Sequence, residues 1–248
     1  MTEKLSSRRW GLTSNQLRFL ALGLMLLDHL WATLVPGQLW MTCLGRLAFP
    51  IFAFQIAEGY AHTHDWKAYA KRLFWFGVLS EVPFNLMIFS SPLFPFHQNV
   101  MFTLLLGLCA IHYLDVAWQI EKPLARWKPL LKAMGCILLG GIGMTDYGML
   151  GVTTVVLFWV CRRLPYSWVF QLAGMLALHV FAAEGQTVPL TLGSFFWEAP
   201  LQAFAVLALP LIWLYNGQKG RSSKALQYAA YAFYPVHMLV LAAIVMLR

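Results

Sequence analysis

Long apolar runs recur along this chain of 248 residues, and short basic loops separate them. A helix needs about 20 mostly apolar residues to cross a bilayer, because each residue advances it by about 1.5 Å. Only 11% of the residues are charged and 60% are hydrophobic, whereas a soluble domain carries about 25% charged residues. The sequence therefore predicts an all-α, polytopic membrane bundle with about nine transmembrane helices. The expected segments are residues 16–35, 44–61, 72–90, 99–117, 130–145, 147–162, 166–183, 199–215 and 226–247.

Basic residues gather in alternate loops, which predicts the orientation of the bundle. The positive-inside rule places such loops, together with the N-terminal arm, in the cytoplasm. An odd number of helices then places the C-terminus outside. The net charge of +8 thus reports membrane topology, and no nucleic-acid partner is expected. The cations that define the cytoplasmic side are Lys4, Arg8, Arg9, Arg18, Lys67, Lys71, Arg72, Lys122, Arg126, Lys128, Lys132, Arg162, Arg163, Lys219, Arg221 and Lys224.

The expected helices leave no room for a separate soluble domain, because the stretches between them are at most about a dozen residues. We therefore expect one membrane domain over residues 1–248. The fifth and sixth segments are short, and the glycine-rich stretch 140–148 joins them as a tight hairpin or a re-entrant pair. The four cysteines stand singly, and no metal-binding motif occurs, so no metal is predicted.

Several ionisable or amide side chains interrupt the apolar segments. Such a group costs about 2.5 to 3.5 kcal/mol inside a bilayer when it is charged, so each needs a partner, a cavity or a function. A helical bundle that served only as a lipid anchor would not retain so many. The residues concerned are Asp28, His29, Arg46, Glu58, Glu81, Asn85, Asn99, Tyr231, Tyr234 and His237.

The spacing of Arg18 and His29 places both on one face of the first helix, because 11 residues at 100° each return to within about 20° of the starting direction. A guanidinium pairs well with phosphate, and an imidazole exchanges protons near neutral pH. This stripe therefore suits a ligand with an anionic head and a thin arm. The alternative is a boundary arginine and a histidine satisfied by Asp28 or by a backbone carbonyl.

Depth along the expected helices brings three titratable groups to a similar level. His29 lies about 18 Å from the cytoplasmic face, His237 lies at a similar depth, and Glu81 is about a turn short of them. Asn85 shares a helical face with Glu81, and Pro83 between them frees a backbone carbonyl. We expect these groups to converge near the middle of the membrane.

Four short motifs, taken together and in this order, resemble the TraX family. TraX proteins are bacterial inner-membrane proteins named for the enzyme that acetylates the N-terminus of conjugative pilin. The resemblance covers nearly the whole chain, from Arg18 to His237, in the same order and at similar spacing. The segments that carry it are Leu26–His29, Gly45–Phe54, Asn99–Phe102 and Tyr231–His237.

The Arg18-to-His29 spacing also resembles the R-x(10)-H motif of the wider transmembrane acyltransferases, some of which O-acetylate cell-surface glycans. That resemblance implies His29 as general base and Arg18 as a residue that binds the acyl-CoA donor. Arg46, Asn99 and His237 match TraX motif positions. Asp28 precedes His29 as in TraX proteins, and an Asp-His dyad is one possible arrangement, although adjacent residues point about 100° apart.

The sequence thus predicts an acyl-CoA-dependent acyltransferase of the bacterial inner membrane that moves an acetyl or short acyl group to an amine or hydroxyl. The acceptor is a pilin N-terminus or a cell-envelope glycan, and transfer is direct or passes through an acyl-histidine. The alternative functions are an ion- or proton-coupled transporter and a non-catalytic assembly factor.

The expected catalytic residues are His29, Asp28, His237 and Glu81. Arg18 and Arg46 are expected to bind acetyl-CoA. The residues expected to bind the acceptor are Asn85, Asn99, Glu58 and Tyr234. Arg46 and Tyr234 are also candidates for stabilising the oxyanion.

Overall fold

The computed structural model describes residues 10–183, 185–193, 195–221 and 223–247. Its internal contacts divide the chain into two compact units. Unit 1 comprises residues 1–52 and 172–248, and unit 2 comprises residues 53–171. The single domain expected over the whole chain stays a prediction. The cations Lys4, Arg8 and Arg9, expected in the cytoplasmic arm, lie outside the described residues.

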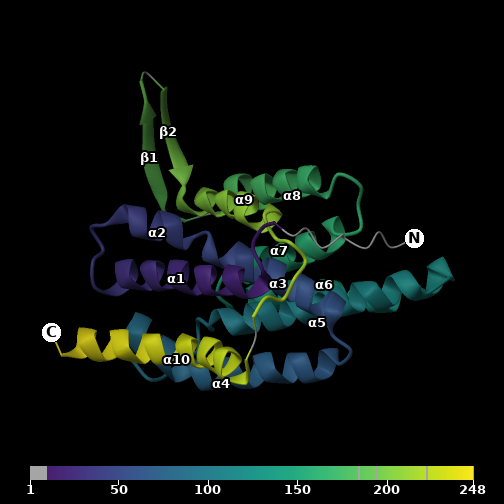
Figure 1. Cartoon of the computed structure of the whole chain (residues 1–248), viewed down its shortest axis with the longest axis horizontal. Coiled ribbons are helices and arrows are strands. Elements are labelled where there is room, and N and C mark those ends of the chain that lie inside the picture. Colours follow the sequence, from purple (N-terminus) through teal and green to yellow (C-terminus); the bar gives the residue numbers. More distant parts are fainter. Residues whose placement is uncertain (1–9, 184, 194, 222, 248) are drawn as a thin grey trace. The chain divides into compact units, whose positions relative to one another are not determined.

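Helices occupy most of each apolar segment that the sequence predicts (Figure 1). Their bounds differ from the expected ones by a few residues, because polar capping residues and not the apolar runs decide where a helix begins and ends. The α-helices are α1 (Ser14–Thr33), α2 (Leu39–Gly45), α3 (Ala48–His62), α4 (Trp66–Phe89), α5 (Val100–Gln119), α6 (Trp127–Ile142), α7 (Gly148–Cys161), α8 (Ser167–Leu176), α9 (Ala208–Trp213) and α10 (Lys224–Met246). The shorter turns are η1 (Pro123–Ala125), the π-helical η2 (Ala177–Phe181) and the 3₁₀-helical η3 (Leu201–Leu207).

Four helical segments in the described part of the chain are long and apolar enough to cross a membrane. Three further apolar helices are shorter than a full span. The fold is therefore that of a helical membrane protein, while the count of nine spans and the cytoplasmic N-terminus stay predictions. The long segments are Leu39–His62, Trp66–Phe89, Val100–Gln119 and Tyr228–Met246; the short ones are Gly148–Cys161, Ser167–Phe181 and Leu201–Trp213.

Unit 1 is built around α1, which packs against α2 and α10. A capping box begins α1, because the Thr13 side chain accepts from the Gln16 N–H and the Gln16 side chain accepts from the Thr13 N–H. Just before it, the Leu12 N–H donates to the Leu214 carbonyl at 2.7 Å. The start of α1 is thus fastened to the loop that leads into α10, which fixes the two helices that carry His29 and His237.

A β-hairpin corrects the prediction of a purely helical chain. Strands β1 (Thr187–Leu192) and β2 (Phe195–Pro200) pair antiparallel and extend away from η3 (Figure 1). The expected helical segment 199–215 overlaps the end of this second strand, residues 199 and 200. Alternating Leu190, Thr191 and Leu192 next to Gly193 were the signal that favours a strand and a turn.

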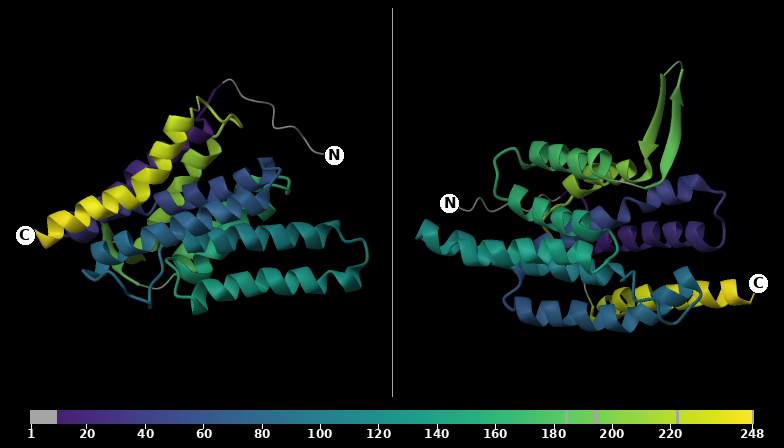
Figure 2. Two further views of the ribbon diagram at one scale, coloured as in Figure 1. Left: turned by 90° about the horizontal axis from the view of Figure 1, so that it is seen from below. Right: turned by 180° about the vertical axis from the view of Figure 1, so that it is seen from behind.

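Unit 2 packs α5 against α4, α6 and α7. Small residues allow the helices to approach closely: a Cβ at Gly107 of α5 would lie 2.7 Å from a methyl group of Val155 on α7. Between α6 and α7 the chain turns tightly, with Met144 and Tyr147 at positive φ. Figure 2 shows α5 and α6 side by side as a long helical pair. The glycine-rich stretch therefore forms the tight turn of a helical hairpin.

Candidate functional site

Two histidines from opposite ends of the sequence meet in unit 1. Nδ1 of His29, on α1, lies 2.7 Å from Nε2 of His237, on α10. The planes of the two rings lie 8° from parallel, and the ring centroids are 4.9 Å apart. His237 is buried, so this contact lies among the packed side chains of α1 and α10. The sequence predicts His29 and His237 at a similar depth in the membrane, and in the structure they lie within hydrogen-bond distance of each other.

Hydrogen bonds around His237 determine which nitrogen of His29 can act as a base. Nδ1 of His237 lies 2.7 Å from the Phe233 carbonyl, which is only an acceptor, so this nitrogen carries the proton. In a neutral ring Nε2 of His237 is then an acceptor, and Nδ1 of His29 must donate to it. A neutral His29 therefore keeps its lone pair on Nε2. No hydrogen bond to that atom occurs among the residues that the structure describes.

Asp28, the neighbour of His29, faces a different set of partners. Nη2 of Arg46 lies 2.5 Å from both carboxylate oxygens of Asp28, and the Thr42 hydroxyl donates to the same carboxylate at 2.7 Å. Thr42 lies on α2 and Arg46 directly follows it, so this cluster joins α1 to α2. Within the described residues no hydrogen bond links Asp28 to His29. Thr42 is a contributor that the sequence analysis did not name.

Gly45 makes this cluster sterically possible. A Cβ atom at position 45 would lie 2.9 Å from Cγ of Asp28 and closer still to its Cβ. Only a residue without a side chain lets α2 approach Asp28 this closely. The Gly45–Arg46 pair thus combines a close helix contact with the cation that neutralises the carboxylate.

Arg18 lies three turns before His29 on the continuous helix α1, as the sequence predicts. Its side chain is half-buried. In the described part of the chain it makes no hydrogen bond or ion pair. Its guanidinium donors are therefore available to a ligand, and its contact with the donor stays a prediction.

Unit 2 holds the other predicted polar groups of the site. The Asn99 side chain caps α5 by accepting from the Met101 N–H at 3.0 Å, and its amide donates to the Gly77 carbonyl at 2.9 Å and to Glu81. The second carboxylate oxygen of Glu81 and the amide oxygen of Asn85 are buried without a partner among the described residues. Asn99 therefore has a structural role. The convergence of Glu81 with His29 stays a prediction.

Two further predicted acceptor-binding residues have clear neighbours. Nε of Arg162 donates to the Glu58 carboxylate at 2.8 Å, and His62 lies 3.2 Å from its other oxygen. Tyr234 is buried, with its ring centroid 6.0 Å from that of His237. Glu58 is thus held in an ion-paired cluster of unit 2, whereas Tyr234 lies beside the histidine pair of unit 1.

Comparison with known proteins establishes the family. A family model described as TraX protein matches residues 13–245. The chain belongs to the TraX family. It is also similar to a protein of Dichelobacter nodosus described as "Probable fimbrial assembly protein FimC, serogroup H1", with 30% identity over 254 residues that cover 95% of this chain and 96% of that protein. No solved structure matches the chain.

In this TraX family member the motifs that carried the sequence resemblance are neighbours in the fold. Leu26–His29 and Tyr231–His237 supply the paired histidines, and Gly45 and Arg46 supply the partner of Asp28. The residues named from these three motifs all lie in unit 1, whereas the motif that begins at Asn99 lies in unit 2. The TraX motifs therefore mark the histidine pair, the ion pair of Asp28 with Arg46, and one helix cap.

Proposed function

We propose that this TraX family member is an acyltransferase of the bacterial cytoplasmic membrane that moves an acetyl group from acetyl-CoA to an amine. The observation that carries the proposal is the His29–His237 pair, in which the backbone carbonyl of Phe233 leaves Nε2 of His29 as the free base. A base oriented by a second group that is itself fixed is the arrangement that nucleophilic acyl transfer uses.

In the proposed reaction, Nε2 of His29 accepts a proton from the acceptor amine as that nitrogen attacks the thioester carbonyl. The carbonyl oxygen becomes an oxyanion, and the imidazolium of His29 is stabilised through its Nδ1–H bond to His237. When the C–S bond breaks, the thiolate of CoA takes the proton back from His29. The products are an amide and CoA with a free thiol, and the enzyme returns to its starting state.

Asp28 and Arg46 act in this proposal as a positioning pair and not as proton carriers. Both oxygens of Asp28 accept from the Arg46 guanidinium, and in the described residues the carboxylate makes no hydrogen bond to His29. The pair instead holds α2 against the part of α1 that carries His29. Donor binding is assigned to Arg18, whose unused guanidinium donors match the phosphate groups of acetyl-CoA.

The acceptor in the proposal is the N-terminal amine of a pilin. Membership of the TraX family and similarity to a protein described as a probable fimbrial assembly protein support this choice. A short amine-terminated peptide is therefore the first acceptor to test, with a glycan hydroxyl as the comparison. The same proton transfer at His29 serves both acceptors.

The test measures release of the CoA thiol by the purified chain in detergent with acetyl-CoA and a pilin N-terminal peptide. His29→Gln should lower the rate about 10²- to 10⁴-fold, the usual contribution of a general base. His179→Gln is the matched control, because His179 is a buried histidine of unit 1 that bonds to the Gln202 side chain. Full turnover by a folded His29→Gln protein would overturn the proposal.

His237 is a positioning residue, and its test separates orientation from folding. His237→Leu removes the acceptor for the Nδ1–H of His29 and should lower kcat while leaving KM for acetyl-CoA unchanged. His237→Gln supplies an amide oxygen in place of the ring nitrogen and should restore part of kcat. Equal losses in both variants would show that His237 has a structural role only.

Electrogenic flux in vesicles without thioester turnover would favour a transporter over the proposed acyltransferase.

A further inference from the structure

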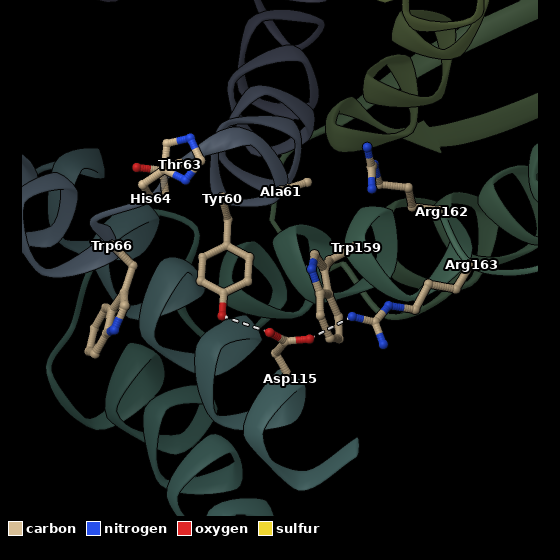
Figure 3. A pocket seen from close by; sticks show the side chains of 9 residues that line it. All are labelled: Tyr60, Ala61, Thr63, His64, Trp66, Asp115, Trp159, Arg162 and Arg163. Carbon is tan, nitrogen blue, oxygen red and sulfur yellow. Dashed lines mark hydrogen bonds and ion pairs between the residues drawn. The ribbon is translucent and has the colours of Figure 1, made fainter. Parts of the chain in front are cut away.

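A cavity lies in unit 2, at the end where α3 ends and α4 begins (Figure 3). Its volume is about 310 Å³, the lower end of the roughly 300 to 1,000 Å³ typical of ligand pockets. It therefore fits a small polar group. The side chains that matter for its chemistry all belong to unit 2 and are Tyr60, Trp66, Asp115, Trp159, Arg162 and Arg163.

The cavity lies where helices long enough to cross a membrane begin and end. The segment Leu39–His62 ends beside it, Trp66–Phe89 begins beside it, and Asp115 lies one turn before the end of Val100–Gln119. The ends of such segments reach the boundary between the hydrocarbon and water, where phospholipid headgroups lie. The cavity is thus at the level of the headgroups.

Two guanidinium groups are held in place beside this cavity. Nη2 of Arg163 lies 2.6 Å from Asp115, and Nε of Arg162 pairs with Glu58 at 2.8 Å. Each ion pair uses one nitrogen of a group that carries five N–H donors, and in the described residues the others form no hydrogen bond. Both arginines can therefore bind phosphate oxygens without leaving their carboxylates.

Charges of the two signs are balanced around the cavity, which matches a ligand that carries one charge of each sign. The carboxylates Asp115 and Glu58 pair with the two arginines, and Asp65 caps α4 by accepting from the Ala68 N–H at 2.9 Å. Lys67 supplies the third cation. The groups counted, with the histidines neutral, are thus the carboxylates Glu58, Asp65 and Asp115 and the cations Lys67, Arg162 and Arg163.

A place for a positive group lies on the other side of Asp115 from the arginines. Figure 3 shows the rings of Tyr60 and Trp66 on one side of Asp115 and the two guanidinium groups on the other. Asp115 accepts from Arg163, from the Tyr60 hydroxyl and from the Gln119 amide. A carboxylate can accept about four hydrogen bonds, so one acceptor position remains for an ammonium N–H.

The aromatic walls favour a primary ammonium over a quaternary one. Trp66 stacks on His112 with the ring centroids 3.7 Å apart, and Trp159 stacks on Trp118 at 4.5 Å. One face of each lining tryptophan is therefore covered, and the rings cannot enclose a quaternary ammonium on all sides. A primary ammonium can instead donate to Asp115 while it lies against the exposed part of a ring.

We propose that this cavity binds the phosphoethanolamine headgroup of a membrane phospholipid. The phosphate accepts from Arg162 and Arg163, and the ammonium donates to Asp115 beside Tyr60 and Trp66. The position of the cavity at the ends of the membrane-spanning segments identifies the source of the headgroup as a lipid of the surrounding bilayer. This lipid site is independent of the reaction proposed at His29.

The test is native mass spectrometry of the full chain, delipidated in detergent and titrated with phosphatidylethanolamine, phosphatidylglycerol or phosphatidylcholine of the same acyl chains. Phosphatidylethanolamine should bind most tightly. Arg162→Gln should raise the dissociation constants of phosphatidylethanolamine and phosphatidylglycerol alike, each at least about tenfold, because both lipids carry the phosphate.

Asp115→Asn tests the ammonium end. The asparagine oxygen can still accept from Arg163, so the cavity wall is kept while the negative charge is lost. Binding of phosphatidylethanolamine should weaken at least about tenfold, and binding of phosphatidylglycerol should not weaken. Trp66→Leu should act in the same direction. Arg72→Gln is the control, because Arg72 stacks on Tyr69 outside the cavity wall and should leave both lipids unaffected.

Four results would overturn the lipid site. Equal binding of the three lipids, or an equal loss in Arg72→Gln, would show lipid bound to the general surface only. Equal or tighter binding of phosphatidylcholine would exclude the primary ammonium. An equal loss of both lipids in Asp115→Asn by a folded protein would show that Asp115 only supports the wall. Glycerophosphoethanolamine that bound as tightly as the lipid would show a soluble ligand instead.

Discussion

The two units each place a carboxylate within an apolar helix, and they compensate it in different ways. In unit 1, both oxygens of Asp28 lie against Arg46, and Thr42 adds a further donor. In unit 2, one oxygen of Glu81 accepts from Asn99, and the other is buried with no donor among the described residues. An acceptor without a donor is costly in an apolar surrounding.

Asp28 is therefore a paired structural carboxylate, whereas Glu81 keeps one oxygen that can still accept a hydrogen bond. Asp28 has little left to offer a substrate, and its pairing instead fixes α1 against α2 beside His29. Glu81 and Asn85 on α4 each keep one acceptor oxygen, which suits an amine or hydroxyl donor from a ligand. The comparison therefore predicts that mutation of Asp28 damages folding, whereas mutation of Glu81 does not.

The largest expected effect on stability comes from Asp28→Asn. This change leaves the Arg46 guanidinium without its counter-charge, and we expect the free energy of unfolding to fall by about 3 kcal/mol. That is the lower end of the range for a buried pair, because the two side chains remain 16% and 20% exposed. Chemical unfolding in detergent measures the difference.

Glu81→Gln is the matched variant for the comparison. The amide oxygen of glutamine can still accept from Asn99, so the free energy of unfolding should change by less than about 1 kcal/mol. If Glu81→Gln destabilised the protein as much as Asp28→Asn, the distinction between the two carboxylates would be wrong.

A smaller loss is expected from Gly45→Ala. The new methyl group would meet Asp28, 2.9 Å from Cγ, and must force α2 away from α1. Such overpacking costs about 2 kcal/mol, and thermal unfolding should report it. Gly23→Ala on α1 is the control, because a Cβ at position 23 meets nothing within 4 Å. An equal loss in both variants would show that the close approach to Asp28 is unimportant.

The smallest expected effect is a pH dependence in unit 2. The neighbouring carboxylate of Asp146 raises the pKa of His97 above its usual value, and Nε2 of His97 lies 3.7 Å from Oδ1 of Asp146. Because the pKa is higher in the folded chain, the stabilisation is complete below about pH 6.5 and is lost as the pH rises through the raised pKa. Exposure of 40% and 34% keeps it below about 1 kcal/mol.

Thermal unfolding of the wild type and Asp146→Asn between about pH 5 and about pH 9 tests this ion pair. The difference between their unfolding midpoints should shrink as the pH rises. A difference that stays constant across this range would show that the charge on His97 contributes nothing. The same variant should leave thioester turnover at His29 unchanged.

Much of the fold was predictable because apolar runs long enough for a helix can satisfy their backbone only within themselves. Residues 187–200 were missed, since a short hairpin depends on pairing between two strands and on a turn that includes Gly193. The cavity of unit 2 was missed as well. Its lining residues are spread along the chain between Tyr60 and Arg163. Taken singly, its arginines are typical of a cytoplasmic loop and its aromatic residues of a membrane–water interface.

Local spacing along the chain is enough to predict the helical segments, the basic loops and the positions of Arg18 and His29 on one helix. The contact between His237 and His29, 208 residues apart, and the pairing of Asp28 with Arg46 instead of His29 depend on how the helices pack. A buried polar group forms its hydrogen bond with whichever suitable group lies nearest in space. Which helices pack together decides which group that is.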